Sequence, residues 1–210
     1  MQRGLKVSLS SLIFVVLLVS ILGIAYSRVT PDDVVGLLLA RLPEPQITQE
    51  DFLRVLPALL GFGARIDFDA PIEDFIALLT DLGVIPEGFE IDPGAPVTKG
   101  WASVLKVKAT NIRPGLIEWA QIQIYGLTPE IAFRMAVRAG VMAPGEPTDL
   151  ETGMEFACDA LATASRARSH PLPGASIPDI LAVIEAITAQ VCTRTDCLPI
   201  IPRIVPIPTS

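Results

Sequence analysis

Proline stands shortly before an acidic residue and a run of helix-periodic apolar residues at four places in this chain. A proline at the first helical position gives up an N–H group that has no partner there, and a carboxylate in the first turn suits the helix dipole. We therefore expect helices to begin at Pro31, Pro71, Pro129 and Pro178. Starts of this kind commit much of the chain to helix and predict a mainly α fold.

The spacing of apolar residues supports these helices. In the segment 71–82, the residues Ile72, Phe75 and Leu79 fall on one helical face, and Gly83 is a natural residue to end the helix. The same period predicts helices over 129–139 and 178–191.

A second kind of helix start is a threonine followed three residues later by an acidic residue, which resembles a capping box. Thr48 and Thr152 fit this pattern, and Thr98 precedes a further apolar run. Pro57 interrupts the run after Thr48, so a kink or an early end is expected there. The segment 119–125 alternates apolar and polar residues, and the choice between a short strand and another structure stays open.

The chain also contains an internal repeat. The segments 82–88 and 139–145 match each other, and each leads from a proline-started helix through a turn-rich loop to a threonine-started helix. Self-similarity of this kind indicates supersecondary units that bury their faces on one another. We expect helix–loop–helix repeats with an additional C-terminal helix. The expected boundaries are 1–27 (leader), 28–66 (degenerate first unit), 67–110 (unit), 111–126 (connector), 127–166 (unit), 167–197 (C-terminal helix) and 198–210 (proline-rich tail).

The best unit carries three motifs in order. Asp67-Phe68-Asp69-Ala70 precedes its first helix, Leu82-Gly83-Val84-Ile85 ends that helix, and Ala95-Pro96-Val97-Thr98-Lys99-Gly100 opens the second helix. This order resembles the S-layer homology (SLH) repeat. The likeness is best over 67–109, weaker over 127–165 and marginal over 30–64.

The resemblance implies binding of envelope polysaccharide, with the basic residue after the threonine holding an anionic sugar. Gln49 replaces that basic residue in the first unit, and Thr152 is followed by Gly153 in the last unit. Trp101 is either a core residue or a surface on which a sugar stacks. Carried over by position, the glycan-binding candidates are Thr98, Lys99, Thr48 and Glu50, and Trp101 is added to them as a candidate stacking surface.

The first 27 residues read as an export signal or a retained membrane anchor. Arg3 and Lys6 precede an apolar run from Leu12 to Ala25, and the small residues near Ser27 suit a cleavage site.

The chain has a net charge of −7 and lacks a Lys/Arg cluster, so nucleic acid and anionic lipid are not expected partners.

Three cysteines in an exported chain suggest one disulfide and one remaining thiol. Cys192 and Cys197 lie close together in the sequence and are the expected pair, while Cys158 fits a buried apolar position. Two cysteines and the single His170 do not supply the four ligands of a structural zinc site, so no metal and no cofactor is expected.

No catalytic residue is expected either. Ser103-Val104-Leu105-Lys106 matches the Ser-x-x-Lys pattern, but the companion motifs of that chemistry are missing from the sequence, and Lys106 is expected on the solvent face of its helix. The sequence therefore predicts an exported, non-catalytic protein of the cell envelope that contacts polysaccharide or protein. The alternatives are a membrane-tethered structural protein without glycan binding and an unrecognised periplasmic hydrolase.

Overall fold

A computed structural model describes residues 28–194 of the chain. The expected leader over 1–27, Cys197 and the proline-rich tail over 198–210 lie outside the described residues. The prediction of a mainly helical fold is confirmed, and the described part holds two isolated β-bridges but no strand. Its elements are α2 (Pro31–Arg41), α3 (Gln49–Leu59), the 3-10 helix η1 (Gly63–Arg65), α4 (Ile72–Asp81), α5 (Lys99–Ala109), α6 (Leu116–Tyr125), α7 (Pro129–Arg138), α8 (Gly153–Ser169) and α9 (Ile177–Gln190).

The helix starts expected from proline and threonine are confirmed. Proline lies in the first turn of α2, α7 and α9, and Pro71 caps α4. The hydroxyls of Thr48, Thr98 and Thr152 each accept a hydrogen bond from a backbone N–H in the first turn of the helix that they cap. These caps fix where α3, α5 and α8 begin.

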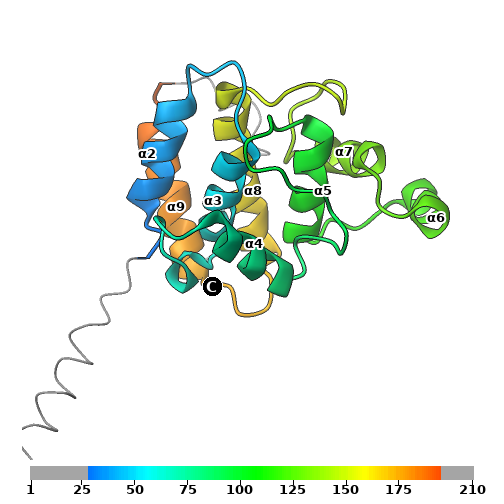
Figure 1. The fold of residues 1–210 in the computed structure, drawn as a ribbon, viewed down its shortest axis with the longest axis horizontal. Coiled ribbons are helices and arrows are strands. Elements are labelled where there is room, and N and C mark those ends of the chain that lie inside the picture. Colours follow the sequence, from blue (N-terminus) through cyan, green and yellow to red (C-terminus); the bar gives the residue numbers. More distant parts are fainter. Residues whose placement is uncertain (1–27, 195–210) are drawn as a thin grey trace, which may run out of the picture.

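Three helix–loop–helix units close around one another (Figure 1). They are α2 with α3, α4 with α5, and α7 with α8. The first helix of each unit packs on the second helix of another: α4 on α3, α7 on α5, and α2 on α8. The C-terminal helix α9 then packs against α2, α3 and α8.

A ring of backbone hydrogen bonds lies where the three units meet. The residues immediately before the capping threonines are Ile47, Val97 and Glu151. The N–H of Val97 donates to the carbonyl of Ile47 at 2.9 Å, that of Glu151 to Val97 at 2.9 Å, and that of Ile47 to Glu151 at 3.1 Å. The ring satisfies every N–H of the three residues inside the core, where an unpaired polar group is costly.

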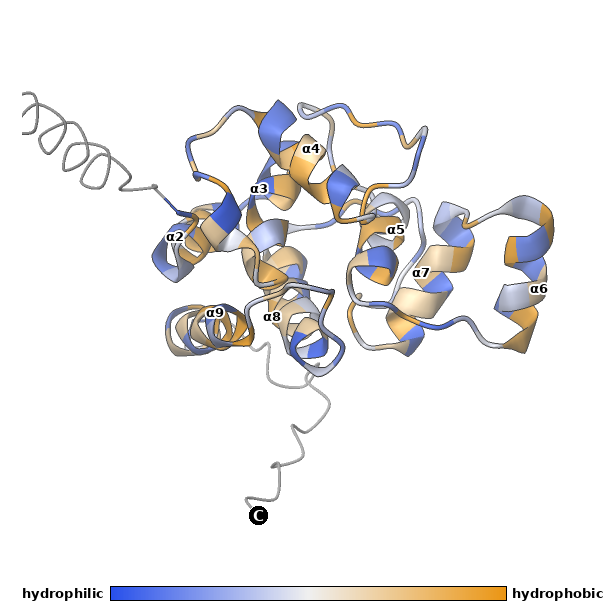
Figure 2. Cartoon of the chain, turned by 90° about the horizontal axis from the view of Figure 1, so that it is seen from below, coloured by the Kyte–Doolittle hydropathy of each residue, from blue (hydrophilic) through white to orange (hydrophobic). Residues whose placement is uncertain are grey.

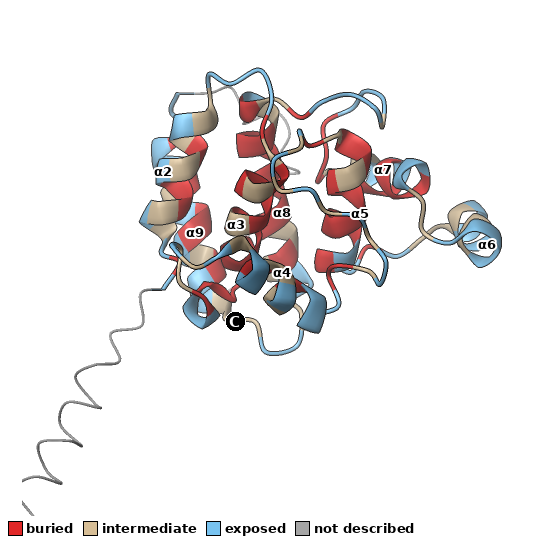
Figure 3. Cartoon of the chain, viewed as in Figure 1, coloured by how far each residue is buried: buried red, intermediate tan, exposed pale blue. Residues whose placement is uncertain are grey.

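The second helices of the units form the centre of the molecule. Figure 3 shows α3, α5 and α8 as largely buried, with shorter buried stripes on the helices around them. Among residues 28–194, the buried apolar core runs from Val29 to Cys192. A chain that begins at residue 28 therefore keeps the whole described core.

Two local expectations are resolved by the structure. Pro57 lies inside α3, which continues to Leu59 and ends there, so the interruption is a helix end soon after the proline. The undecided segment 119–125 belongs to α6, which is helical.

No helix among the described residues is both long enough and apolar enough to span a bilayer.

Candidate functional site

Lys99, the candidate for holding an anionic sugar, points into the protein. Its side chain is 5% exposed, and its Nζ lies 2.8 Å from Oε1 of Glu155 on α8. The same Nζ donates to the carbonyl of Pro144 at 3.3 Å. Although partial burial opposes it, the hydrogen bond from Lys99 holds the pKa of Glu155 below its ordinary value. The cation is thus neutralised within the fold and is not presented to solvent.

The side chains of the other glycan-binding candidates also make contacts within the protein. Thr48 and Thr98 cap helices, and the carboxylate of Glu50 pairs with Arg54 at 2.9 Å. Trp101 is partly buried between the rings of Phe52 and Phe89, and its Nε1 donates to the carbonyl of Glu90 at 3.1 Å. The structure therefore brings the starts of α3 and α5 together, as the β-bridge between Thr48 and Pro96 also shows, but their side chains do not form an open cationic site.

The most unusual group of charges lies in the core between α5 and α8. Lys106 is 2% exposed, and both Glu151 and Asp159 are fully buried. Lys106 Nζ lies 3.1 Å from Glu151 Oε1 and 2.9 Å from Asp159 Oδ2. The ring of Phe52 on α3 lies 5.6 Å from the same Nζ, and the N–H of Ala143 donates to Asp159 at 3.4 Å. The expectation that Lys106 faces solvent is wrong.

This buried Lys106–Glu151–Asp159 cluster has one cation for two carboxyl groups. Burial alone would lower the pKa of Lys106, but the two carboxylates raise it above its ordinary value. Burial raises the pKa of Glu151 to about 7, against the opposing effect of Lys106, and burial likewise raises the pKa of Asp159. A proton held on Glu151 makes the cluster neutral, which a low-dielectric core favours.

Ser103 lies one helical turn before Lys106, as in a Ser-x-x-Lys pair. Ser103 is fully buried, and its hydroxyl has no hydrogen-bond partner. Because Ser103, Lys106 and both carboxyl groups are enclosed, a substrate has no route to them in this structure. The cluster joins α5 to α8 within the core.

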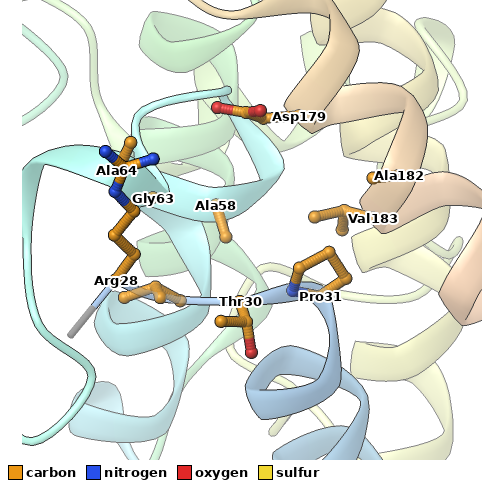
Figure 4. Close-up of a pocket in the computed structure, with 10 residues that line it drawn as sticks. Arg28, Thr30, Pro31, Ala58, Gly63, Ala64, Asp179, Ala182 and Val183 are labelled. Atoms are coloured by element: carbon orange, nitrogen blue, oxygen red, sulfur yellow. The ribbon is translucent and has the colours of Figure 1, made fainter. Parts of the chain in front are cut away.

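A small pocket of about 180 Å³ lies elsewhere, between the start of α2, the end of α3 with η1, and α9 (Figure 4). Small and apolar side chains such as Ala58, Ala64 and Val183 form much of its lining. Arg28 and Asp179 are the only charged residues in its lining, and the Thr30 hydroxyl there is used to cap α2 through its hydrogen bonds with Asp33. Among residues 28–194, no three His, Cys, Asp or Glu side chains are grouped to hold a metal ion.

The predicted disulfide between Cys192 and Cys197 is wrong at Cys192, which carries a free and buried thiol. Cys158 on α8 is the residue that is disulfide-bonded. Closeness in sequence therefore suggested the wrong partner. The thiol of Cys192 is buried in the core at the end of α9, which packs on α8.

The sequence reasoning missed the buried cluster, although one signal pointed to it. Lys106 lies four residues after Ala102 and three before Ala109, and both alanines are fully buried on α5. A lysine between two such positions falls on the inward face of the helix.

Comparison with known proteins adds no parallel for this arrangement: no family model, no curated protein and no solved structure matches the chain.

Proposed function

We propose that this chain is an exported, non-catalytic module that anchors or organises other components at the cell envelope. Its architecture would be that of SLH-like repeats, which the order of motifs over 67–109 suggests. The closed arrangement of three units around the ring of Ile47, Val97 and Glu151 supports the proposal, since each unit enters the ring through the residue before its capping threonine. Export rests on the sequence of residues 1–27.

The observation that carries a non-catalytic role is the burial of the reactive side chains. Lys99 pairs with Glu155, and Lys106 pairs with Glu151 and Asp159, so these charges stabilise contacts between α5 and α8. A role in binding then falls to the outer surface of the units. The enclosed position of Ser103 supports the same proposal over a periplasmic hydrolase.

The position of Lys99 favours protein contacts over an anionic polysaccharide as the basis of attachment. An anionic sugar needs an accessible cation, ideally a planar arginine fork. The residue that the SLH resemblance assigns to this task is 5% exposed and already paired. A tethered interaction protein without glycan binding is therefore the second candidate function.

Cosedimentation of the chain that begins at residue 28 with purified cell-wall sacculi tests the proposal. Three preparations are compared: complete sacculi, sacculi stripped of their secondary polysaccharide, and sacculi treated with protease. We expect binding to complete sacculi that protease treatment removes. Failure of the folded protein to sediment with any preparation would remove the envelope function.

Two lysine variants separate the kinds of ligand. Lys99→Met keeps the apolar stem but removes the charge, and Lys108→Met is the matched control because Lys108 is exposed on the same helix. We expect both variants to bind complete sacculi as the wild type does. A folded Lys99→Met protein that loses binding, while Lys108→Met keeps it, would restore the polysaccharide site.

A further inference from the structure

Helix α6 turns its apolar side away from the protein. Figures 1 and 2 show it at one end of the molecule, beyond α7 and outside the body formed by the other helices. None of its residues is buried. Its exposed large apolar side chains are Leu116 at 85%, Ile117 at 75%, Ile124 at 72%, Tyr125 at 70% and Trp119 at 54%.

The polar side of α6 holds it to the protein, together with Ile122, which packs against the core. Glu118 pairs with Arg138 of α7, and Arg134 of α7 donates to Gln121 at 2.5 Å. Arg138 also donates to the carbonyl of Arg113 at 3.2 Å, in the segment before α6. A surface helix of a globular protein normally buries its apolar stripe and exposes its polar one, so α6 is inverted everywhere except at Ile122.

The outward face of α6 is broad. At about 100° per residue, the positions from Trp119 through Leu116, Ala120 and Ile124 to Ile117 span roughly 160° of the helix. Gln123 is the one polar residue within this span. A face of this width is wider than the narrow seam with which one helix packs into a partner's groove.

The charges around α6 are mostly positive, although the chain as a whole is acidic. Four basic residues of the segment 108–138 are exposed: Lys108, Arg113, Arg134 and Arg138. The segment contains only two acidic residues, Glu118 and Glu130. Over 66–98, in contrast, the sequence holds eight acidic residues and no basic one. The net charge of −7 therefore hides a basic stretch around α6, in which Arg134 and Arg138 contact the polar side of the helix.

We propose that α6 is an interfacial helix that inserts its outward apolar face into the surface of a lipid membrane. Aromatic and aliphatic side chains on one face, with cations on the opposite polar side, match the chemistry of the boundary between lipid headgroups and acyl chains. A second copy of the chain suits this face less well, because the face is broader than the narrow seam through which two helices pair. The proposal adds a lipid contact to the proposed polysaccharide or protein contacts and does not depend on them.

The test uses the chain from residue 28, which keeps the whole described core, and lipid vesicles. One set holds equal parts phosphatidylglycerol and phosphatidylcholine, and the other holds phosphatidylcholine alone. The wild type should sediment with the mixed vesicles and more weakly with phosphatidylcholine. The double variant Ile117→Gln/Ile124→Gln should bind the mixed vesicles about tenfold more weakly or worse, because it removes two aliphatic side chains from the inserted face.

Further variants test the chemistry of the contact. Met154→Gln, which removes an exposed apolar side chain from α8, should bind as the wild type does. Arg113→Gln should weaken binding to the mixed vesicles only, and less so at high salt. Brominated lipid should quench the fluorescence of the wild type but not that of Trp119→Phe, whose remaining tryptophan is Trp101.

Three results would overturn the proposal. The wild type does not bind either kind of vesicle, or the folded double variant binds as tightly as the wild type. In the third, the wild type self-associates in sedimentation equilibrium without binding vesicles, and the double variant is monomeric. That result would assign the apolar face of α6 to a second copy of the chain.

Discussion

Lys106 Nζ lies 2.9 Å from Asp159 Oδ2, and this contact joins α5 to α8 inside the core. Glu151 accepts a second hydrogen bond from the same nitrogen at 3.1 Å and also belongs to the backbone ring of the three units. The cluster is therefore a link between two units at the point where all three meet.

Removing the cation alone should be costly. Lys106→Leu leaves two carboxyl groups buried without their partner, and we expect the free energy of unfolding to fall by about 3–5 kcal/mol. Chemical denaturation at neutral pH measures the change. Lys108→Leu is the control on the exposed side of α5 and should lie within about 0.5 kcal/mol of the wild type.

Replacing the whole cluster should restore most of that stability. Lys106→Leu, Glu151→Ile and Asp159→Val install the residue types of Leu56, Ile47 and Val55, which hold the same places relative to their capping threonine in the first unit and are buried. Well-packed apolar residues often match or exceed a buried ion pair in stability. A triple variant less stable than Lys106→Leu would contradict the structural role of the cluster.

The cluster should also make stability depend on pH. The pKa of Glu151 is raised by burial from 4.5 to about 7 in the folded chain, so the folded state holds a proton that the unfolded state releases. The stabilisation from this group is complete below about pH 4.5 and is lost as the pH rises through about 7. We expect the free energy of unfolding to fall by roughly 1–3 kcal/mol between about pH 5 and pH 8.

Glu151→Gln provides the control for this pH dependence. The amide cannot titrate, so the decrease between about pH 5 and pH 8 should largely disappear. The lowered pKa of Glu118, held down chiefly by Arg138, acts only at more acidic pH and should affect both proteins alike. An equal slope in the variant and the wild type would place the titrating group elsewhere.

Two glycines should respond oppositely to alanine. A Cβ on Gly153 would lie 1.7 Å from the backbone oxygen of Arg41, whereas a Cβ on Gly36 would meet nothing within 4 Å. Gly153→Ala must push α2 away from α8, and we expect a loss of at least about 3 kcal/mol. Gly36→Ala, inside α2, should gain about 0.5–1 kcal/mol. Thermal unfolding of both variants checks the pair, and a neutral Gly153→Ala would disprove the close packing of these units.

Only one thiol per chain should react with a thiol reagent before reduction. Cys158 is disulfide-bonded and Cys192 is free, so the denatured but unreduced chain should react with one equivalent of a thiol reagent. Burial raises the pKa of the Cys192 thiol, so its reaction in the folded protein should be slow. Three reactive thiols in the denatured chain would contradict the disulfide at Cys158.

Much of the fold could be predicted from the sequence because its signals are local. Proline and threonine at helix starts act through the backbone groups of a single turn, and the helices found at Pro31, Thr48 and Pro129 begin where these residues stand. The helical state of α6 was not decided, because the alternation of Gln121 to Ile124 resembles a strand. Contacts from Arg134 and Arg138 of α7 to its polar side hold this helix in place.

The candidate site was harder to predict because burial of a charge depends on distant residues. Lys99 lies in the motif that the SLH resemblance assigns to a ligand, yet Glu155 of another unit meets it inside the protein. The partners of Lys106 lie on the last unit and come close only when the ring forms. A single sequence does not show such contacts, since it does not distinguish a solvated lysine from one that is paired in the core.

We propose that the buried charges hold the units together while the outer surface performs the binding. Cosedimentation of the triple variant Lys106→Leu/Glu151→Ile/Asp159→Val with complete sacculi, beside the wild type, tests it most directly. We predict equal binding by the two proteins, because the substitutions leave the surface unchanged. A triple variant that folds, as judged by circular dichroism, but no longer binds would contradict the claim.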